Sequence, residues 1–363
     1  MENYLVIRGL KEAKHTVFCV GEDGLKTYFD PIFNRLCAFA SGQQVKRAFL
    51  ADIGSEIKQE LPHVTFVKVV KKKDGKITIG EGNMKIEPDI ENAFHLLGGY
   101  WKSKETEDDG EENGILNRRS PHSISSMSPV HPFLATVVNE AISYNRKNTP
   151  NTSVEFAEEA KKGEIRKTID GEDLKTILKL LNKDVDSYSP TQFVPKNKRT
   201  TGLFSFDFVI DLRTLFTVNT SKLNPEIYQK EIDNLKEKGW VEIKYDFGEG
   251  ITAPKEIREK LARAISKAII RWRIQTNQST TFSPMPLLAL AVSNDANKTP
   301  LAIRGELTDV DKAKLVVDHS AAKVFTSDLL SAYIFSPKKE ADISEAEDYI
   351  YNKIMEFDFE NQK

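Results

Sequence analysis

The 363-residue sequence is poor in the residues that build disulfide frameworks and metal centres. It contains only two cysteines, Cys19 and Cys37, without a CxxC pair, and its six histidines show no HxH, HxxxH or HExxH spacing. These absences argue against a disulfide framework and against a zinc site. Both cysteines are predicted to be small buried side chains, and neither a metal nor another cofactor is expected.

Long apolar runs are also missing. No uninterrupted apolar stretch reaches the ~20 residues of a membrane helix. The N-terminus, MENYLVIRGLKEAKH, lacks a basic region followed by an apolar block, so no secretory signal is predicted. With 39% hydrophobic and 29% charged residues, the composition is that of a soluble globular protein. We therefore expect a cytoplasmic protein without a membrane partner.

Several motifs that mark enzymes are absent. The sequence has neither GxGxxG nor GxxxxGK[ST], which excludes the common nucleotide-binding loops, and it has no GxSxG nucleophile elbow. Asp30, in KTYFDPIFNRL, could act as a general acid or base beside a basic cleft. However, Asp-Pro commonly starts turns, and this carboxylate has no identifiable partner. The sequence therefore favours a protein that is not an enzyme.

Charge is nearly balanced but strongly patterned. The chain has 52 Lys+Arg and 54 Asp+Glu, a net charge of −2. This overall charge argues against a general electrostatic attraction of the whole protein to nucleic acid. Acidic residues concentrate at 102–112 and after Glu340. Basic residues concentrate at 68–73, at 118–119, at 196–199 and in the helix expected over 254–274. These segments form either one positive face or ordinary solvated surface.

Hydrophobic periodicity predicts a mixture of strands and helices. Apolar residues recur every four positions over 43–60, which indicates a helix, and strict alternation over 202–215 indicates a half-buried strand. A hairpin is predicted over 64–80, turning at Lys73-Asp74-Gly75. Further helices are predicted over 88–101, 170–181, 225–238 and 254–274. The remaining predictions are a strand or short helix over 133–144, a polar turn over 145–152, and an extended loop or thin hairpin over 187–201. Because strands and helices do not alternate evenly, we expect an α+β fold, an antiparallel sheet packed on helices, with irregular insertions.

The first candidate binding segment is SGQQVKR at the start of the expected helix 43–60. A helix N-terminus offers free backbone N–H groups and a positive dipole end, which together suit a phosphate. Side chains from this segment would add donors and positive charge. The alternative is a plain capped helix with surface charges. The candidate residues are Ser41, Gln43, Gln44, Lys46 and Arg47.

The second candidate lies in NRRSPHSISSMSPVHPF, residues 117–133. Two adjacent arginines followed by serines and prolines do not form an ordinary core element, which raises the question of what holds the segment in place. Guanidinium groups and hydroxyls can contact phosphates and ribose, so a bound partner would supply the order. The alternative is a solvated loop. The candidate residues are Asn117, Arg118, Arg119 and Ser120.

A third segment, 188–199, mixes aromatic and basic residues. Aromatic side chains there could stack on bases while the cations meet the backbone, although a flexible loop without such a role explains the pattern equally well. The candidates are Tyr188, Phe193, Lys196, Lys198 and Arg199.

Taken together and in order, four segments resemble the Cas-seven family of CRISPR-associated proteins, of the RAMP superfamily. They are YLVIRGL, ASGQQVKRAFL, AFHLLGG followed by NRRSPHSISS, and TTGLFSFDFVIDL. The resemblance is to the DevR-like branch, the backbone subunit of type I Cascade surveillance complexes, subtype I-B. It spans most of the chain. A glycine-rich C-terminal loop, common in the wider superfamily, is not evident.

The resemblance implies one palm-type domain over residues 1–363, with an RRM/ferredoxin-like antiparallel palm, a finger or helical insertion at 64–130, and a thumb hairpin within an insertion at 150–201. Copies would stack head to tail as a helical filament along a CRISPR RNA and present it for pairing with target DNA in antiviral defence. The other implied partners are a Cas-five-type cap and the large and small Cascade subunits. All three candidate segments would then contact the guide, with the thumb in 188–199.

Two alternatives remain open from the sequence. Type III relatives cut target RNA with an early acidic residue, for which Asp30 is the candidate here. Alternatively, the chain is an interaction protein that binds no nucleic acid.

Overall fold

A computed structural model describes residues 3–21, 24–73, 76–102, 115–145, 153–158, 168–184, 188, 191–275 and 282–362. Within these ranges the chain has a mixed α+β structure with antiparallel sheets, as the sequence predicts. No helix in the described part is long and apolar enough to cross a membrane.

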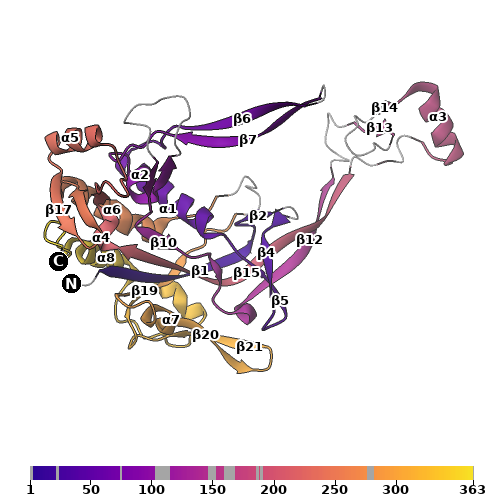
Figure 1. Ribbon diagram of the computed structural model, residues 1–363. Helices are drawn as coiled ribbons and strands as arrows, with labels where there is room; N and C mark the ends of the chain where they lie inside the picture. Colours follow the sequence, from indigo (N-terminus) through magenta and orange to yellow (C-terminus); the bar gives the residue numbers. More distant parts are fainter. Residues whose placement is uncertain are drawn as a thin grey trace.

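The central sheet is built around β1 (Tyr4–Thr16), which lies between β15 (Thr191–Asp211) and β19 (Leu287–Ser293) (Figure 1). β22 (Lys323–Thr326) pairs with β19 at one edge. At the other edge, β10 (His122–Ile124), β11 (Ser128–Pro129) and β12 (Ala135–Asn145) pair in succession along β15. All of these pairings are antiparallel.

The alternating residues of β15 explain how this sheet acquires its core. Phe204, Phe206, Phe208 and Ile210 point to one face and are fully buried. Opposite Phe206 stands Gly9, where a Cβ atom would lie 2.1 Å from the phenyl ring, so only glycine fits beneath it. The alternation over 202–211 therefore marks a strand with one buried face, as predicted.

Helices cover that face of the sheet. They are α1 (Gly42–Ile57), α2 (Ala93–Gly98), α6 (Lys255–Arg271) and α8 (Ala346–Met355). A smaller apolar cluster on the opposite face contains Leu10, Leu203 and Leu330. It is covered by α7 (Lys298–Ala302), the hairpin of β20 (Ile303–Asp309) and β21 (Lys312–Val317), and the 3₁₀ turn Asp328–Ala332.

Replacing Phe49 with alanine is expected to lower the free energy of unfolding by about 3–5 kcal/mol. The Phe49 ring is fully buried in α1 and lies 5.0 Å from the ring of Phe208 on β15. Its loss would leave a cavity between helix and sheet. Urea unfolding measures the change, and Ile57→Ala, at a half-buried position in the last turn of the same helix, is the matched control with a smaller expected loss.

Shorter elements complete the body. They are β2 (Val20–Gly21), β3 (Gly24–Leu25), β4 (Thr27–Asp30), β5 (Arg35–Ala38), β8 (Tyr100–Lys102), β9 (Leu116–Arg118), the 3₁₀ turn Pro132–Leu134, α4 (Leu212–Leu215), β16 (Thr217–Asn219), α5 (Gln229–Glu237), β17 (Val241–Tyr245), β18 (Gly248–Thr252) and the 3₁₀ turn Ile343–Glu345.

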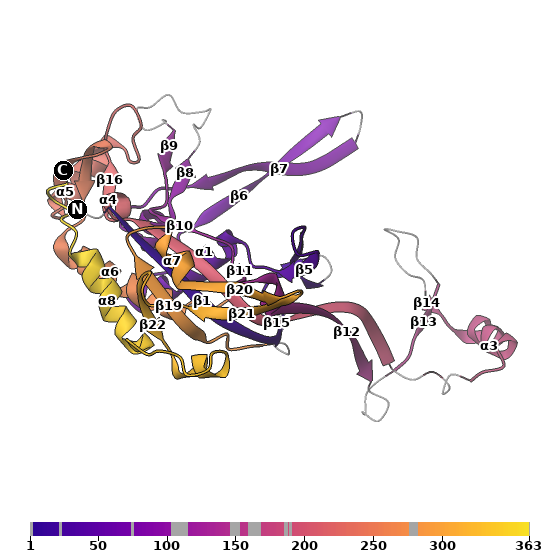
Figure 2. The same cartoon turned by 90° about the horizontal axis from the view of Figure 1, so that it is seen from below.

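Two arms project from the body on the side away from the chain termini (Figures 1 and 2). One is the two-stranded ribbon of β6 (Val64–Lys73) and β7 (Lys76–Ile86), which confirms the predicted hairpin. The other is formed by the outer parts of β12 and β15. It carries β13 (Phe156–Ala157), β14 (Thr168–Ile169) and α3 (Gly171–Leu180) at its end.

Several predicted elements differ in extent. The helix predicted over 88–101 is limited to Ala93–Gly98, because Asn92 caps its start and Gly99, with a φ of 75°, lets the chain turn into β8. The segment 133–144 is a 3₁₀ turn followed by strand β12. Residues 191–201 are the first part of β15, so the hairpin interpretation of 187–201 holds for them. The acidic loop beyond residue 102 and most of the polar turn 145–152 lie outside the described residues.

Candidate nucleic-acid interface

A groove of about 1420 Å³ lies between the start of α1 and the end of α6. It brings together two basic segments that are more than 200 residues apart in the sequence. Its lining residues are Val20, Ser41, Gln43, Gln44, Arg47, Ala48, Ala51, Asp52, Ser55, Arg271, Arg273, Ile274 and Gln275. Four of these belong to the first candidate segment.

The α1 wall begins at a capped helix terminus. Ser41 is the N-cap, its Oγ accepts a hydrogen bond from Gln44 N at 3.4 Å, and the first turn contains no acidic side chain. Gln43 and Arg47 are exposed one turn apart. This end of the helix therefore presents amide donors, a positive dipole end and a guanidinium group to the groove.

The α6 wall depends on a buried tryptophan between two arginines. Trp272 is 1% exposed, and its ring packs edge-on against Phe206 at 4.8 Å. Anchoring Trp272 in the core directs the flanking Arg271 and Arg273 outward, where both are exposed and line the groove. The Arg-Trp-Arg sequence at the end of an amphipathic helix is the signal that could have identified this pair from the sequence.

The charges in the groove are mostly positive. Arg271 Nη1 lies 3.6 Å from the carboxylate of Glu56, whereas Arg47 and Arg273 form no hydrogen bond or ion pair with the residues described. Burial raises the pKa of the Asp52 carboxyl, and the nearby Arg271 opposes that shift. The groove thus combines three guanidinium groups with one half-buried carboxyl, an arrangement that suits a phosphate backbone.

Two of the predicted α1 residues hold the helix in place. Lys46 Nζ donates to the carbonyl oxygen of Gly98 at 2.7 Å, and burial lowers the Lys46 pKa. Gln44 Nε2 donates to the carbonyl oxygen of Phe18 at 3.2 Å. Gln44 still lines the groove, but Lys46 points to a different side of α1. Lys46 does not line the groove, and its ammonium group holds α2 against α1; its assignment as a guide contact stays a prediction.

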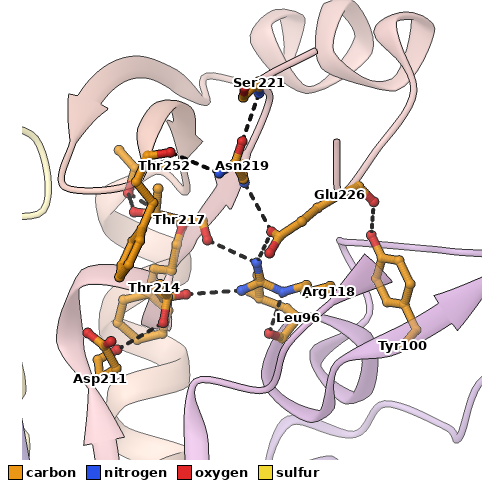
Figure 3. A network of polar contacts seen from close by, with 12 residues as sticks. Leu96, Tyr100, Arg118, Asp211, Thr214, Thr217, Asn219, Ser221, Glu226 and Thr252 are labelled. Carbon is orange, nitrogen blue, oxygen red and sulfur yellow. Dashed lines mark hydrogen bonds and ion pairs between the residues drawn. The ribbon is translucent and has the colours of Figure 1, made fainter. Parts of the chain in front are cut away.

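Arg118 is a structural residue rather than a surface cation (Figure 3). Its side chain is 1% exposed and forms an ion pair with Glu226 at 2.5 Å. The guanidinium group also donates to the carbonyl oxygens of Leu96, Thr214 and Thr217 at 2.9–3.0 Å. The nitrogen atoms of Arg118 already donate to buried partners, which gives the side chain a structural role, and its assignment as a guide contact stays a prediction.

The other residues of this motif divide by exposure. Asn117 and Arg119 are exposed, and Arg119 has no hydrogen bond or ion pair within the described ranges. Ser120 Oγ donates to the carbonyl oxygen of Leu97 at 2.7 Å. None of the four residues lines the groove. Within this motif, the exposed side chains of Asn117 and Arg119 are accessible to a ligand, but they lie outside the groove.

The protein itself orders the rest of this segment. The His122 ring is buried beside Phe49 at 5.2 Å, and burial lowers its pKa to about 3, so the ring is neutral at physiological pH. Further along, Met127 pairs with Ala40 immediately before α1. The segment is therefore held by sheet and helix contacts, which contradicts the expectation that a partner must order it.

The described residues of the third candidate segment do not form one surface. Tyr188 packs edge-on against Phe156 at 5.2 Å. Arg199 is 1% exposed, and its Nε lies 3.1 Å from Glu140 on β12, so it is held inside the protein here and its contact with a guide stays a prediction. Lys198 is half-buried. The side chains of Phe193 and Lys196 lie outside the described part of the structure, and their assignments stay predictions.

Asp30 forms a turn. Its Oδ1 accepts hydrogen bonds from the backbone N–H groups of Ile32 and Phe33 at 2.9 and 3.0 Å, which is the role that Asp-Pro predicts. Across the described residues, no group of three or more His, Cys, Asp or Glu side chains is placed to hold a metal ion.

A buried lysine supports the α6 wall. Lys11 on β1 is 3% exposed, and its Nζ donates to the carbonyl oxygens of Trp272 and Met285 at 3.2 and 3.5 Å. Burial lowers its pKa to about 7, and Arg273 contributes in the same direction. Lys11 therefore links the chain just after α6, next to the groove-lining Arg271 and Arg273, to the segment around Met285.

Replacing Lys11 with methionine is expected to flatten the pH dependence of stability between about pH 7 and about pH 10.4. The unfolded chain has the ordinary lysine pKa of about 10.4 and holds its proton through this interval, whereas the folded protein has lost it. Wild-type stability therefore rises with pH, by at most about 1.4 kcal/mol per pH unit from this group. Urea unfolding across the interval measures the difference, and an equal slope in Lys11→Met would contradict the assignment.

Comparisons with known proteins give a structural likeness only. No family model matches the sequence, and no curated protein matches it. A chain of a solved "CRISPR RNA-guided surveillance complex, pre-nicking" superposes with a TM-score of 0.50 at 9% identity, covering 97% of this chain and 100% of that one. A chain of another "CRISPR RNA-guided surveillance complex" covers 96% and 99% at 9% identity, but its TM-score of 0.43 is too low to support an argument. The first match shows a shared fold over nearly the full length.

Proposed function

We propose that this protein is a non-catalytic backbone subunit of a type I CRISPR surveillance complex, in which copies bind a CRISPR RNA head to tail and present it to target DNA. The observation that carries the proposal is the groove between α1 and α6, where Arg47, Arg271 and Arg273 converge beside the capped α1 terminus. The full-length fold likeness is consistent with it.

The groove suits the backbone of an RNA strand rather than its bases. Its lining combines guanidinium groups, glutamine amides and serine hydroxyls, which pair with phosphate and ribose oxygens. The described residues that line it include no aromatic side chain on which a base could stack. Contacts of this kind do not depend on sequence, as a subunit that accepts guides of any sequence requires.

The architecture also supports an assignment of palm, finger and thumb regions. In this proposal the sheet β10-β15-β1-β19-β22 is the palm, the region 64–130 with the β6–β7 ribbon is the finger insertion, and the β12–β15 arm contains the thumb. Both arms leave the body opposite the termini, so each could reach a neighbouring copy in a head-to-tail array (Figure 2). Such an array is heterologous and does not close on itself. The cap, large and small subunits would complete the complex.

The test is whether assembly size follows guide length. The purified protein is mixed with RNAs of one, two and three spacer lengths, and the mass of each complex is measured by mass photometry. A stepwise increase in bound copies with RNA length is expected. A single copy on every RNA, or no binding, would overturn the backbone role, and RNA cleavage that depends on Asp30 would favour the nuclease alternative instead.

A further inference from the structure

A lysine occupies a position in β1 where the strand faces the apolar core. Leu5, Ile7, Gly9, Lys11 and Ala13 alternate on the side of β1 that the helices cover, and Lys11 is 3% exposed among them. Burying an ammonium group without a charged partner costs far more free energy than burying an apolar side chain. Packing alone therefore does not explain a lysine at this position.

The ammonium group of Lys11 is held by neutral partners. Its Nζ donates to the carbonyl oxygens of Trp272 and Met285, and it lies 4.7 Å from the centre of the Trp272 ring. The pairing of β1 with β19 also shifts register between Leu10 and Lys11, so the strand is irregular where this side chain enters the core. Among the described residues, no carboxylate forms an ion pair with Lys11. The group is a buried amine without a counterion.

Trp272 connects this buried group to the groove. It lies between Arg271 and Arg273, which both line the groove, and its carbonyl oxygen is the acceptor that Lys11 holds at 3.2 Å. The position of the chain at Trp272 determines where the two flanking guanidinium groups can reach. Lys11 therefore acts on the RNA-facing arginines through the backbone that carries them.

The charged groups around Lys11 belong to the groove or pair with it. Burial lowers the Lys11 pKa to about 7, Arg273 after α6 lowers it further, and Asp52 on α1 opposes both. Arg273 and Asp52 line the groove, and Glu56 on α1 pairs with Arg271. The proton on Lys11 is thus sensitive to charge in the groove.

The other neighbours add no charge on the side of the ammonium group. On the adjacent strands Lys11 pairs with Phe204 and Leu287, which are apolar. Glu12 is the next residue of β1 and points to the opposite side, where Tyr333 donates to it. An anion bound in the groove would therefore be a new charge acting on Lys11.

We infer that Lys11 is a positioning residue of the RNA site, which holds the chain between Arg271 and Arg273, and that RNA enters the groove together with a proton on Lys11. This inference rests on the proposed function, because the RNA phosphates are the charges that would act on Lys11. At an effective dielectric constant of about 20, a phosphate about 12 Å from the ammonium group favours the protonated form about tenfold.

The sign of the pH dependence follows from this preference. The free protein loses the Lys11 proton as the pH rises through about 7, whereas the complex keeps it to a higher pH. Binding therefore takes up a proton in this range, and RNA affinity should fall about tenfold as the pH rises from about 6 to about 9.

The first experiment measures the affinity for single-stranded RNA against pH at constant ionic strength, by anisotropy of a fluorophore that does not titrate in this range. The wild-type protein is expected to lose about tenfold in affinity between about pH 6 and about pH 9. Lys11→Met should bind more weakly than the wild type at the acid end and lose this dependence. Lys14→Met, which removes an exposed lysine of the same strand, is the matched control and should keep the wild-type profile.

A second experiment needs no variant. Isothermal titration calorimetry of the wild-type protein with the same RNA, in two buffers of different ionisation enthalpy near pH 7.5, counts the protons taken up on binding. We expect about half a proton for each bound subunit, because the tenfold preference is then partly expressed.

The outcomes separate this inference from the proposed function. An equal pH profile in the wild type and in Lys11→Met would overturn the inference and leave RNA binding in the groove intact. Equal binding enthalpies in the two buffers would have the same meaning. A wild-type protein that binds no RNA at any pH would overturn the proposed function and this inference with it.

Discussion

Replacing Arg118 with alanine is expected to lower the free energy of unfolding by about 3–5 kcal/mol, the cost of breaking a buried ion pair by removing one partner. The variant would leave Glu226 without its cation and the carbonyl oxygens of Leu96, Thr214 and Thr217 without their donor (Figure 3). These groups join β9 and α2 to the sheet of β16, β17 and β18. Loss of Arg118 therefore affects the packing between two parts of the molecule.

Arg119 provides the matched control for this prediction. It is the next residue, of the same type, but exposed. Arg119→Ala is expected to change stability by no more than about 0.5 kcal/mol, as surface substitutions usually do. Urea unfolding of both variants measures the difference. Equal effects would show that Arg118 is not held in the buried network.

The second large effect is expected in the groove. Replacing Arg47 and Arg273 together with alanine should weaken RNA binding about a hundredfold, because each hydrogen bond to a charged group contributes about 1.5 kcal/mol or more, roughly tenfold in affinity. The two side chains come from opposite walls, Arg47 from α1 and Arg273 from the residues just after α6. Arg271 is left in place because the carboxylate of Glu56 already neutralises part of its positive charge.

The salt dependence of binding distinguishes phosphate contacts from other causes. Two lost contacts to a single strand should reduce the slope of log K against log salt by about 1.4, because each contributes about 0.7. The reduction should be the same for guides of different sequence. The matched control is Arg304→Ala, at a half-buried arginine paired with Glu306 on the opposite face of the sheet. An unchanged slope in the groove variant would remove Arg47 and Arg273 from the RNA site.

Much of the fold could be predicted from local patterns. Val45, Phe49 and Ile53 recur at helical spacing after Ser41, and that segment is α1. The alternation of Phe204, Phe206 and Phe208 gave the buried strand β15. In both cases the side chains that define the period are the ones that meet the core, so tertiary contacts and local preference agree.

The site could be predicted only in part, because it depends on burial and on distant neighbours. Two adjacent arginines look equivalent in the sequence, yet alternation along β9 turns its last residue, Arg118, inward, and Arg119, just beyond the strand, is exposed. A local pattern could have suggested this, but only the polar partners from residues 214–226 explain why a buried arginine is tolerated. Similarly, the Arg-Trp-Arg sequence suggests that Arg273 points away from the core, but only the tertiary structure shows that Trp272 packs on Phe206 and that Arg273 shares a groove with Arg47.

The central claim is that this protein binds a CRISPR RNA along a row of copies. The most direct measurement is to purify it from cells that express a CRISPR array, record the mass of the particle, and sequence the RNA that accompanies it. The proposal predicts spacer-containing RNA in a large, regular assembly, and loss of that RNA in the Arg47→Ala, Arg273→Ala variant. An RNA-free monomer, even when the other complex subunits are expressed with it, would contradict the claim.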